Sequence, residues 1–154
     1  MNHLPLTRTS LSSESGQAAV EFALALPLLL IVLLGLIDFG FAFNYWNDTQ
    51  HLASTAARYA AVGRSPSGTL QSYIRSQADT ADLRNGGTRQ IPDALKVCVS
   101  FPNGRVVGQP VHVEVTTNYA WMPYLGIGAA TIGGRATMRL ETVPDPAIVP
   151  DGCA

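Results

Sequence analysis

The chain has 154 residues and a formal net charge of −1, and charged residues make up 14% of it. This length suits one small domain with a modest core and an appendage. The near-zero charge provides no basic surface of the kind that binds nucleic acid, so we expect no nucleic-acid partner.

One apolar run explains much of the shortage of charge. From Phe22 to Phe43, Asp38 is the only charged residue. A bilayer core about 30 Å thick is crossed by about 20 helical residues, and the run reaches this length. Its apolar residues surround the helix instead of forming one stripe, which is not typical of a helix in so small a soluble domain. The run therefore predicts a transmembrane helix.

A cleaved secretory signal peptide is the alternative to a retained helix, with Gly40-Phe41-Ala42 as a weak cleavage site. The run is longer than the apolar region of a signal peptide, and the preceding leader has Arg8 as its basic residue. Aromatic residues at the far end are typical of an interfacial belt and favour retention: Phe39, Phe41, Phe43, Tyr45 and Trp46. The few nearby basic residues leave the orientation of the helix open.

The segment Gly16 to Phe22 (GQAAVEF) places an acid at the entry of this helix. It resembles the type IV prepilin cleavage signature, at which a membrane aspartyl peptidase cuts after the glycine. Glycine lets the backbone lie extended in a protease cleft, and an acid one turn into a helix favours its positive end. The resemblance implies cleavage between Gly16 and Gln17. It also implies that Glu21, beside Phe22, pairs with the new amine of a neighbouring subunit.

A longer stretch carries a more specific resemblance. Its features are the AAVEFAL entry, Pro27, the acid-Phe-Gly at Asp38–Gly40 and the AARYAAV segment at 56–62. They are similar to the N-terminus of TadE-like proteins of tight-adherence (Flp-type) pilus systems, and a looser similarity continues to the strand at 135–141. This resemblance implies a minor pilin or pseudopilin. The implied partners are the membrane, a prepilin peptidase, other pilin or pseudopilin subunits and the pilus assembly complex.

The resemblance also implies a place and an orientation. We expect a single-pass protein of the bacterial inner membrane, with its N-terminus in the cytoplasm and its C-terminal domain outside. The predicted parts are a leader at 1–16, a transmembrane helix that continues outside the membrane at 17–63, and a small α+β domain at 64–154. One alternative is a membrane-anchored interaction domain without pilin-type processing. Another is a secreted protein cut after Ala42.

Periodicity organises the rest of the chain into helices. Residues at helical spacing extend the first helix to a C-cap at Gly63: Leu52, Ala53, Ala56, Ala57, Ala60 and Ala61. Their small side chains would allow close packing either of another helix backbone or of the chain's own domain. A second amphipathic helix is predicted from Thr69 to Arg84, and Asn85-Gly86-Gly87 ends it.

Alternating apolar residues predict three antiparallel strands near 95–101, 111–116 and 135–141. Asn103-Gly104 is a hairpin turn signal, and Pro110 belongs at an edge, a bulge or a strand start. The region 119–130 is expected to be looser, and the glycines at 126, 128, 133 and 134 are attributed to turns. The predicted class is α+β: a long N-terminal transmembrane, pilin-like helix followed by a small antiparallel-sheet head.

Two cysteines and one acid are further candidates. Cys98 and Cys153 would form a disulfide in an oxidising compartment, with two free thiols as the alternative. Asp38 lies about 26 Å beyond Glu21 along a helix. There it makes an intramembrane polar contact or reaches toward water.

Residues with the spacing of a catalytic or metal site are missing from the sequence. His3, His51 and His112 are scattered, and Asp79 and Asp82 are expected on a solvated helix face. We therefore predict no enzyme activity, cofactor, metal or small-molecule substrate.

Overall fold

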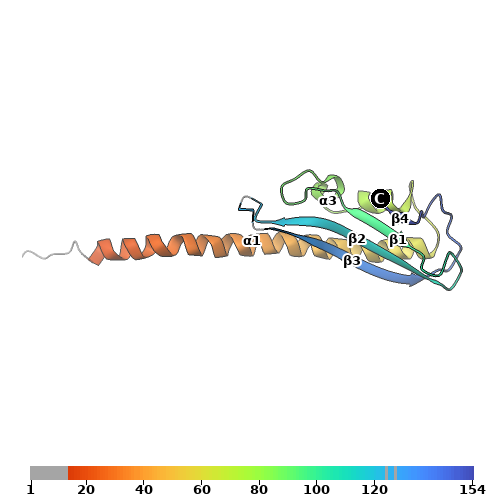
Figure 1. The fold of residues 1–154 in the computed structure, drawn as a ribbon, viewed down its shortest axis with the longest axis horizontal. Helices are drawn as coiled ribbons and strands as arrows, with labels where there is room; N and C mark the ends of the chain where they lie inside the picture. Colours follow the sequence, from red (N-terminus) through yellow and green to blue (C-terminus); the bar gives the residue numbers. More distant parts are fainter. Residues whose placement is uncertain (1–13, 124, 127) are drawn as a thin grey trace, which may run out of the picture. The chain divides into compact units, whose positions relative to one another are not determined.

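The computed structural model describes residues 14–123, 125–126 and 128–154 (Figure 1). Most of the predicted leader, residues 1–13, lies outside the described residues. The fold is α+β, as predicted, and its elements follow in the order α1 (Glu14–Ala61), α2 (Leu70–Ser76), α3 (Ala81–Asn85), β1 (Lys96–Ser100), β2 (Pro110–Trp121), β3 (Gly128–Arg139) and β4 (Gly152–Cys153).

Helix α1 passes through two compact units of the chain, which divide between Ile37 and Asp38. In the first unit its apolar side chains from Phe22 onward are exposed. Among the described residues, α1 is the one helix long and apolar enough to cross a membrane. It runs from Glu14 to Ala61 and continues without interruption through Pro27.

In the second unit, the C-terminal half of α1 packs on the head. Its small residues at helical spacing, from Leu52 to Ala61, are almost completely buried. Small side chains let the sheet approach the helix closely, so these residues serve the chain's own core, one of the two predicted uses. The helix ends before Gly63, whose φ of 64° is readily adopted by glycine. The N–H of Gly63 donates to the carbonyl oxygen of Ala60 at 3.1 Å.

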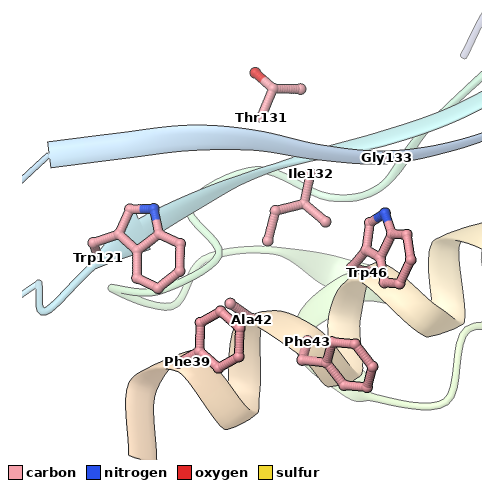
Figure 2. A pocket seen from close by; sticks show the side chains of 8 residues that line it. All are labelled: Phe39, Ala42, Phe43, Trp46, Trp121, Thr131, Ile132 and Gly133. Atoms are coloured by element: carbon pink, nitrogen blue, oxygen red, sulfur yellow. The ribbon is translucent and has the colours of Figure 1, made fainter. Parts of the chain in front are cut away.

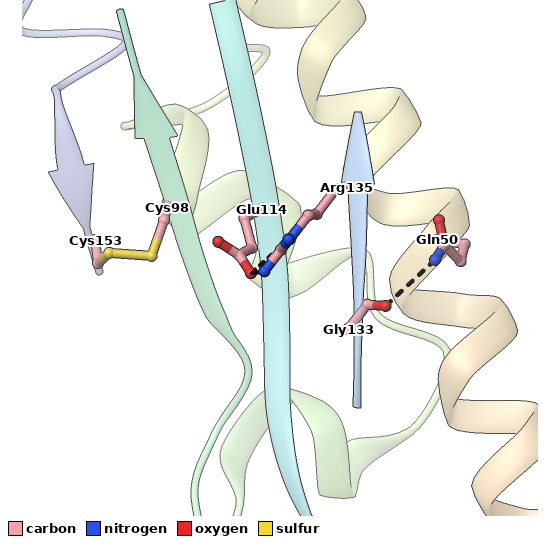
Figure 3. Close-up of polar contacts among 6 residues, drawn as sticks. All are labelled: Gln50, Cys98, Glu114, Gly133, Arg135 and Cys153. Atoms are coloured by element: carbon pink, nitrogen blue, oxygen red, sulfur yellow. Dashed lines mark hydrogen bonds and ion pairs between the residues drawn. A yellow bond between two sulfur atoms is a disulfide. The ribbon is translucent and has the colours of Figure 1, made fainter. Parts of the chain in front are cut away.

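The head sheet is antiparallel throughout and has the strand order β3-β2-β1-β4. Its inner face is built from alternate buried valines, among them Val97, Val99 and Val113. Its outer face carries polar residues, and Figure 3 shows an ion pair there between Glu114 and Arg135 at 2.7 Å. The period-2 alternation therefore identifies the core face correctly.

β2 and β3 are longer than predicted, β1 lies within its predicted range, and a fourth strand is present. β2 reaches Trp121 and β3 starts at Gly128, so both ends of the looser region expected at 119–130 are strand. Every second residue of β2 faces the core, and this alternation continues beyond the valines to Thr117 and Tyr119, which are both buried. β4 pairs with β1 and brings the C-terminus to the sheet.

Gly133 and Gly134 lie inside β3, so their assignment to a turn was wrong. A Cβ atom at Gly134 would meet the carbonyl oxygen of Thr49 and would lie 2.5 Å from Cα of Gln50. The glycine is required because the backbones of β3 and α1 touch here. Gln50 Nε2 also donates to the carbonyl oxygen of Gly133 at 3.2 Å (Figure 3).

The second predicted helix is divided into α2 and α3, so its continuous form was wrong. Thr69 and Thr80 each cap one short helix, and their hydroxyls accept from backbone N–H groups three residues later, both at 3.3 Å. Between the helices, the N–H of Asp79 donates to Asp48 Oδ2 at 3.0 Å. Helix continuation is lost because these side chains from the threonines and from α1 bind the backbone instead.

Candidate processing and anchoring sites

The proposed cleavage segment lies in the first turns of α1. Gly16, Gln17, Glu21 and Phe22 are all exposed, and Gln17 Nε2 donates to Glu21 Oε1 at 3.2 Å. A Cβ atom at Gly16 would meet nothing within 4 Å. The bond between Gly16 and Gln17 lies in this helical turn. Gly16 makes the turn easier to unwind, since glycine lowers helix stability by about 1 kcal/mol relative to alanine.

Asp38 lies elsewhere, at the start of the head, and is 6% exposed. Tyr119 Oη lies 2.6 Å from Asp38 Oδ1 and 3.0 Å from the Asp38 carbonyl oxygen. Gln90 Nε2 donates to Oδ1 and the backbone N–H of Met122 to Oδ2, each at 3.0 Å. The carboxylate thus accepts from three residues in two segments of its own head, which offsets the cost of its burial. We call these four residues the Asp38 cluster.

The sequence did not predict the partners of Asp38. They come from two segments that are far from residue 38 in the chain: Gln90 precedes β1, and Tyr119 and Met122 lie at and just after the end of β2. The one sequence signal for this contact was the alternation of inward-facing residues along β2, which places Tyr119 on the face toward α1. Met122 has a φ of 37°, which residues other than glycine rarely adopt. This conformation accompanies the N–H contact to the carboxylate.

Burial and hydrogen bonding change the acidity of groups around this part of α1. Burial is the main cause that raises the pKa of Tyr119 above its usual value, and the hydrogen bond to Asp38 adds to it. Burial also raises the pKa of Tyr45, and Asp82, which accepts from its hydroxyl at 3.3 Å, adds to this rise. The phenols therefore stay neutral at physiological pH and act as hydrogen-bond donors.

Cys98 and Cys153 form a disulfide between β1 and β4 (Figure 3). The two residues are directly opposed in the antiparallel register. Val97 and Ala154 add two backbone hydrogen bonds, at 2.9 and 3.0 Å, beside this pair. The disulfide therefore fastens the C-terminal segment to the sheet. Among the described residues, no group of three or more His, Cys, Asp or Glu side chains is placed to hold a metal ion.

An exposed apolar helix followed by a folded head defines a protein with a single membrane anchor. Residues 16–58 match the family model described as TadE-like protein. This match confirms the resemblance found in the sequence: residues 16–58 are similar to TadE-like proteins. The matched segment begins at Gly16 and contains Glu21 and Asp38. Neither the curated proteins nor the solved structures gave a match.

Proposed function

We propose that the chain is a pilin-like subunit of a tight-adherence pilus system and is cut by a prepilin peptidase between Gly16 and Gln17. The family match over residues 16–58 carries this proposal. In it, α1 is inserted with its N-terminus in the cytoplasm, and the head lies outside the membrane. The role of the chain is assembly through α1, with other pilin or pseudopilin subunits and the assembly complex as partners.

The position of Glu21 supports this role. The side chain is exposed at the entry of the apolar helix, and its described contact is to Gln17 on the same helix. A carboxylate at this place is costly in a bilayer unless it is paired. After cutting, the amine of Gln17 on a neighbouring subunit supplies an opposite charge, and the pair sets one axial register between the helices.

The contacts of the head argue against the secreted alternative. A cut after Ala42 would remove Asp38 and leave the buried hydroxyl of Tyr119 without this acceptor. It would also remove Ala42 itself, which belongs to the hydrophobic core. The uncut anchor keeps all of these contacts, so processing is what distinguishes it from the pilin-like proposal.

Mass spectrometry of the mature N-terminus, after expression together with a prepilin peptidase, tests the proposal. We expect the chain to begin at Gln17. An intact leader would contradict the proposal in favour of the plain anchor, and a start at Phe43 would contradict it in favour of secretion. We further expect Gly16→Ala to abolish cutting while Gly40→Ala does not, although both sites have room for the added methyl group.

A further inference from the structure

The β2–β3 hairpin divides into a charged half and an uncharged half. Residues 115–134 contain no Asp, Glu, Lys, Arg or His. The other half carries charges close to both ends of this run, including Glu114 and Arg135. The uncharged half contains the hairpin end, by which we mean the part of β2 and β3 around Trp121 and Gly128. Leu125 in the connection between the strands is 61% exposed.

The Asp38 cluster holds this hairpin end beside the helix. Tyr119 and Met122 both donate to Asp38, and Trp121 lies between them in the chain. The ring of Trp121 packs edge-on against Tyr119, with 5.1 Å between the ring centroids. The hairpin end is therefore fixed at the level of residue 38 on α1.

A groove opens where the hairpin end faces the helix (Figure 2). It has a volume of about 350 Å³, and we call it the aromatic groove: Phe39, Ala42, Phe43, Trp46, Trp121, Thr131, Ile132 and Gly133 line it. Figure 2 shows Trp121 and Ile132 on one side and the helix residues on the other. Phe39, Phe43 and Trp46 remain about half exposed. The surface is thus apolar, aromatic and open.

The length of the anchor gives the depth of this groove. From Phe22 to Asp38, the helix rises about 24 Å, against a bilayer core of about 30 Å. If the core begins near Phe22, Asp38 lies about 6 Å inside its outer edge, and the groove residue Ala42, after about 30 Å of rise, lies at that edge. Tryptophan is enriched at this interfacial level because its ring is apolar and its N–H is polar.

We propose that the hairpin end and the aromatic groove form a second membrane contact, by which the head sits in the interfacial layer of phospholipid. The groove takes the glycerol and upper acyl region of lipids. Its helix residues Phe39, Ala42 and Phe43 belong in sequence to the apolar run at 22–43, and residues 115–134 carry no charge, so lipid is favoured over a second protein copy. The inference rests on α1 as a membrane anchor and does not require cutting after Gly16.

The only two tryptophans of the chain, Trp46 and Trp121, both line the groove and provide the probe. The full chain is reconstituted in phosphatidylcholine vesicles at low protein density, as Trp46→Phe and Trp121→Phe variants with one tryptophan each. We expect lipids brominated near the headgroup to quench most of the emission from both. Lipids brominated near the chain ends should quench less, and aqueous acrylamide should have little effect. Trp121 quenched by acrylamide and not by brominated lipid would overturn the proposal.

A charge in the hairpin connection separates lipid from the other occupants. In the Trp46→Phe background, we expect Leu125→Asp to reduce lipid quenching of Trp121 and to increase its quenching by acrylamide. The control Val143→Asp changes a similarly exposed residue near the C-terminal end of α1 and should have no effect. Protection from both quenchers that appears only at high protein density would show a second copy in the groove and would also overturn the proposal.

Discussion

The two acids of the apolar helix show how burial decides the role of a residue. Glu21 is exposed, and its carboxylate is available to another chain. Asp38 is buried, and its carboxylate accepts from Tyr119, Gln90 and Met122. A buried carboxylate is stable only with such donors. Asp38 therefore stabilises the head, whereas Glu21 is the better candidate for assembly.

The first prediction concerns the Asp38 cluster. Asp38→Ala leaves the buried hydroxyl of Tyr119 without its main acceptor, so the head should lose about 2–3 kcal/mol of unfolding free energy. Tyr119→Phe removes the donor and the unpaired group with it, and should cost about 1 kcal/mol. Urea unfolding of the full chain in detergent, followed by near-ultraviolet circular dichroism, measures both.

Asp151→Ala is the control, because this acid is exposed near the C-terminus. It should unfold at the wild-type urea concentration. If Asp38→Ala also unfolded at the wild-type urea midpoint, the Asp38 cluster would contribute nothing to the stability of the head. Cutting of Asp38→Ala by the peptidase should be unchanged, since Asp38 belongs to the other unit of the chain, while assembly should fall with the stability of the head.

At the scale of elements, local sequence patterns predicted the helices and strands whose formation depends on one segment. They missed the features that depend on a contact between two distant segments. The length and polarity of the run at 22–43 identify the anchor, and the alternating valines identify β1 and β2. The division of α2 from α3 depends partly on a contact with Asp48, which the local sequence does not contain. Gly134 likewise serves a contact with α1, and a glycine pair in a sequence does not distinguish close packing from a turn.

The second prediction uses this close contact. Gly134→Ala places a methyl group against the backbone of Thr49 and Gln50, and backbone atoms cannot rotate away. Overpacking of this kind costs about 1–3 kcal/mol, so the urea midpoint should fall. The control is Gly40→Ala in α1, where the added methyl group meets nothing within 4 Å. Equal midpoints for both variants would contradict the contact.

The third prediction concerns the strand at the C-terminus. The Cys98–Cys153 disulfide closes a loop with a sequence separation of 55 residues. Reduction should lower the unfolding free energy by up to about 4 kcal/mol in the chain-entropy model. Urea unfolding with and without reductant measures the difference. The double variant Cys98→Ser and Cys153→Ser should match the reduced protein and should not respond to reductant, whereas an unchanged midpoint on reduction would refute the contribution.

At the scale of the whole molecule, the segments proposed to contact the membrane are uncharged, and the charged side chains lie on other surfaces. Charged residues are absent from the anchor, from Phe22 to Ile37, and from the hairpin run at 115–134. The outer face of the sheet instead carries the pair Glu114 and Arg135. This face is open and polar, whereas the anchor and the hairpin end are apolar. Glu21 is the exception at the entry of the anchor, so assembly is best tested there.

The last prediction tests the pairing that the proposed function assigns to Glu21. Glu21→Gln keeps the shape of the side chain and removes its charge, so cutting should continue while association with other subunits weakens. Crosslinking of two differently tagged copies in membranes that contain the pilus assembly complex measures this association. Asp151→Asn, the same acid-to-amide change in the head, is the control and should crosslink as the wild type does.

The uncut Gly16→Ala variant lacks the new amine and should show the same loss of crosslinking as Glu21→Gln. If carboxylate and amine form one pair, combining the two changes should cause no further loss, because each single change already removes the whole interaction. Additive losses would mean that Glu21 and the new N-terminus act separately. Undiminished crosslinking of Glu21→Gln would remove the pairing from the proposed function, while the cut after Gly16 would still be judged by the mature N-terminus.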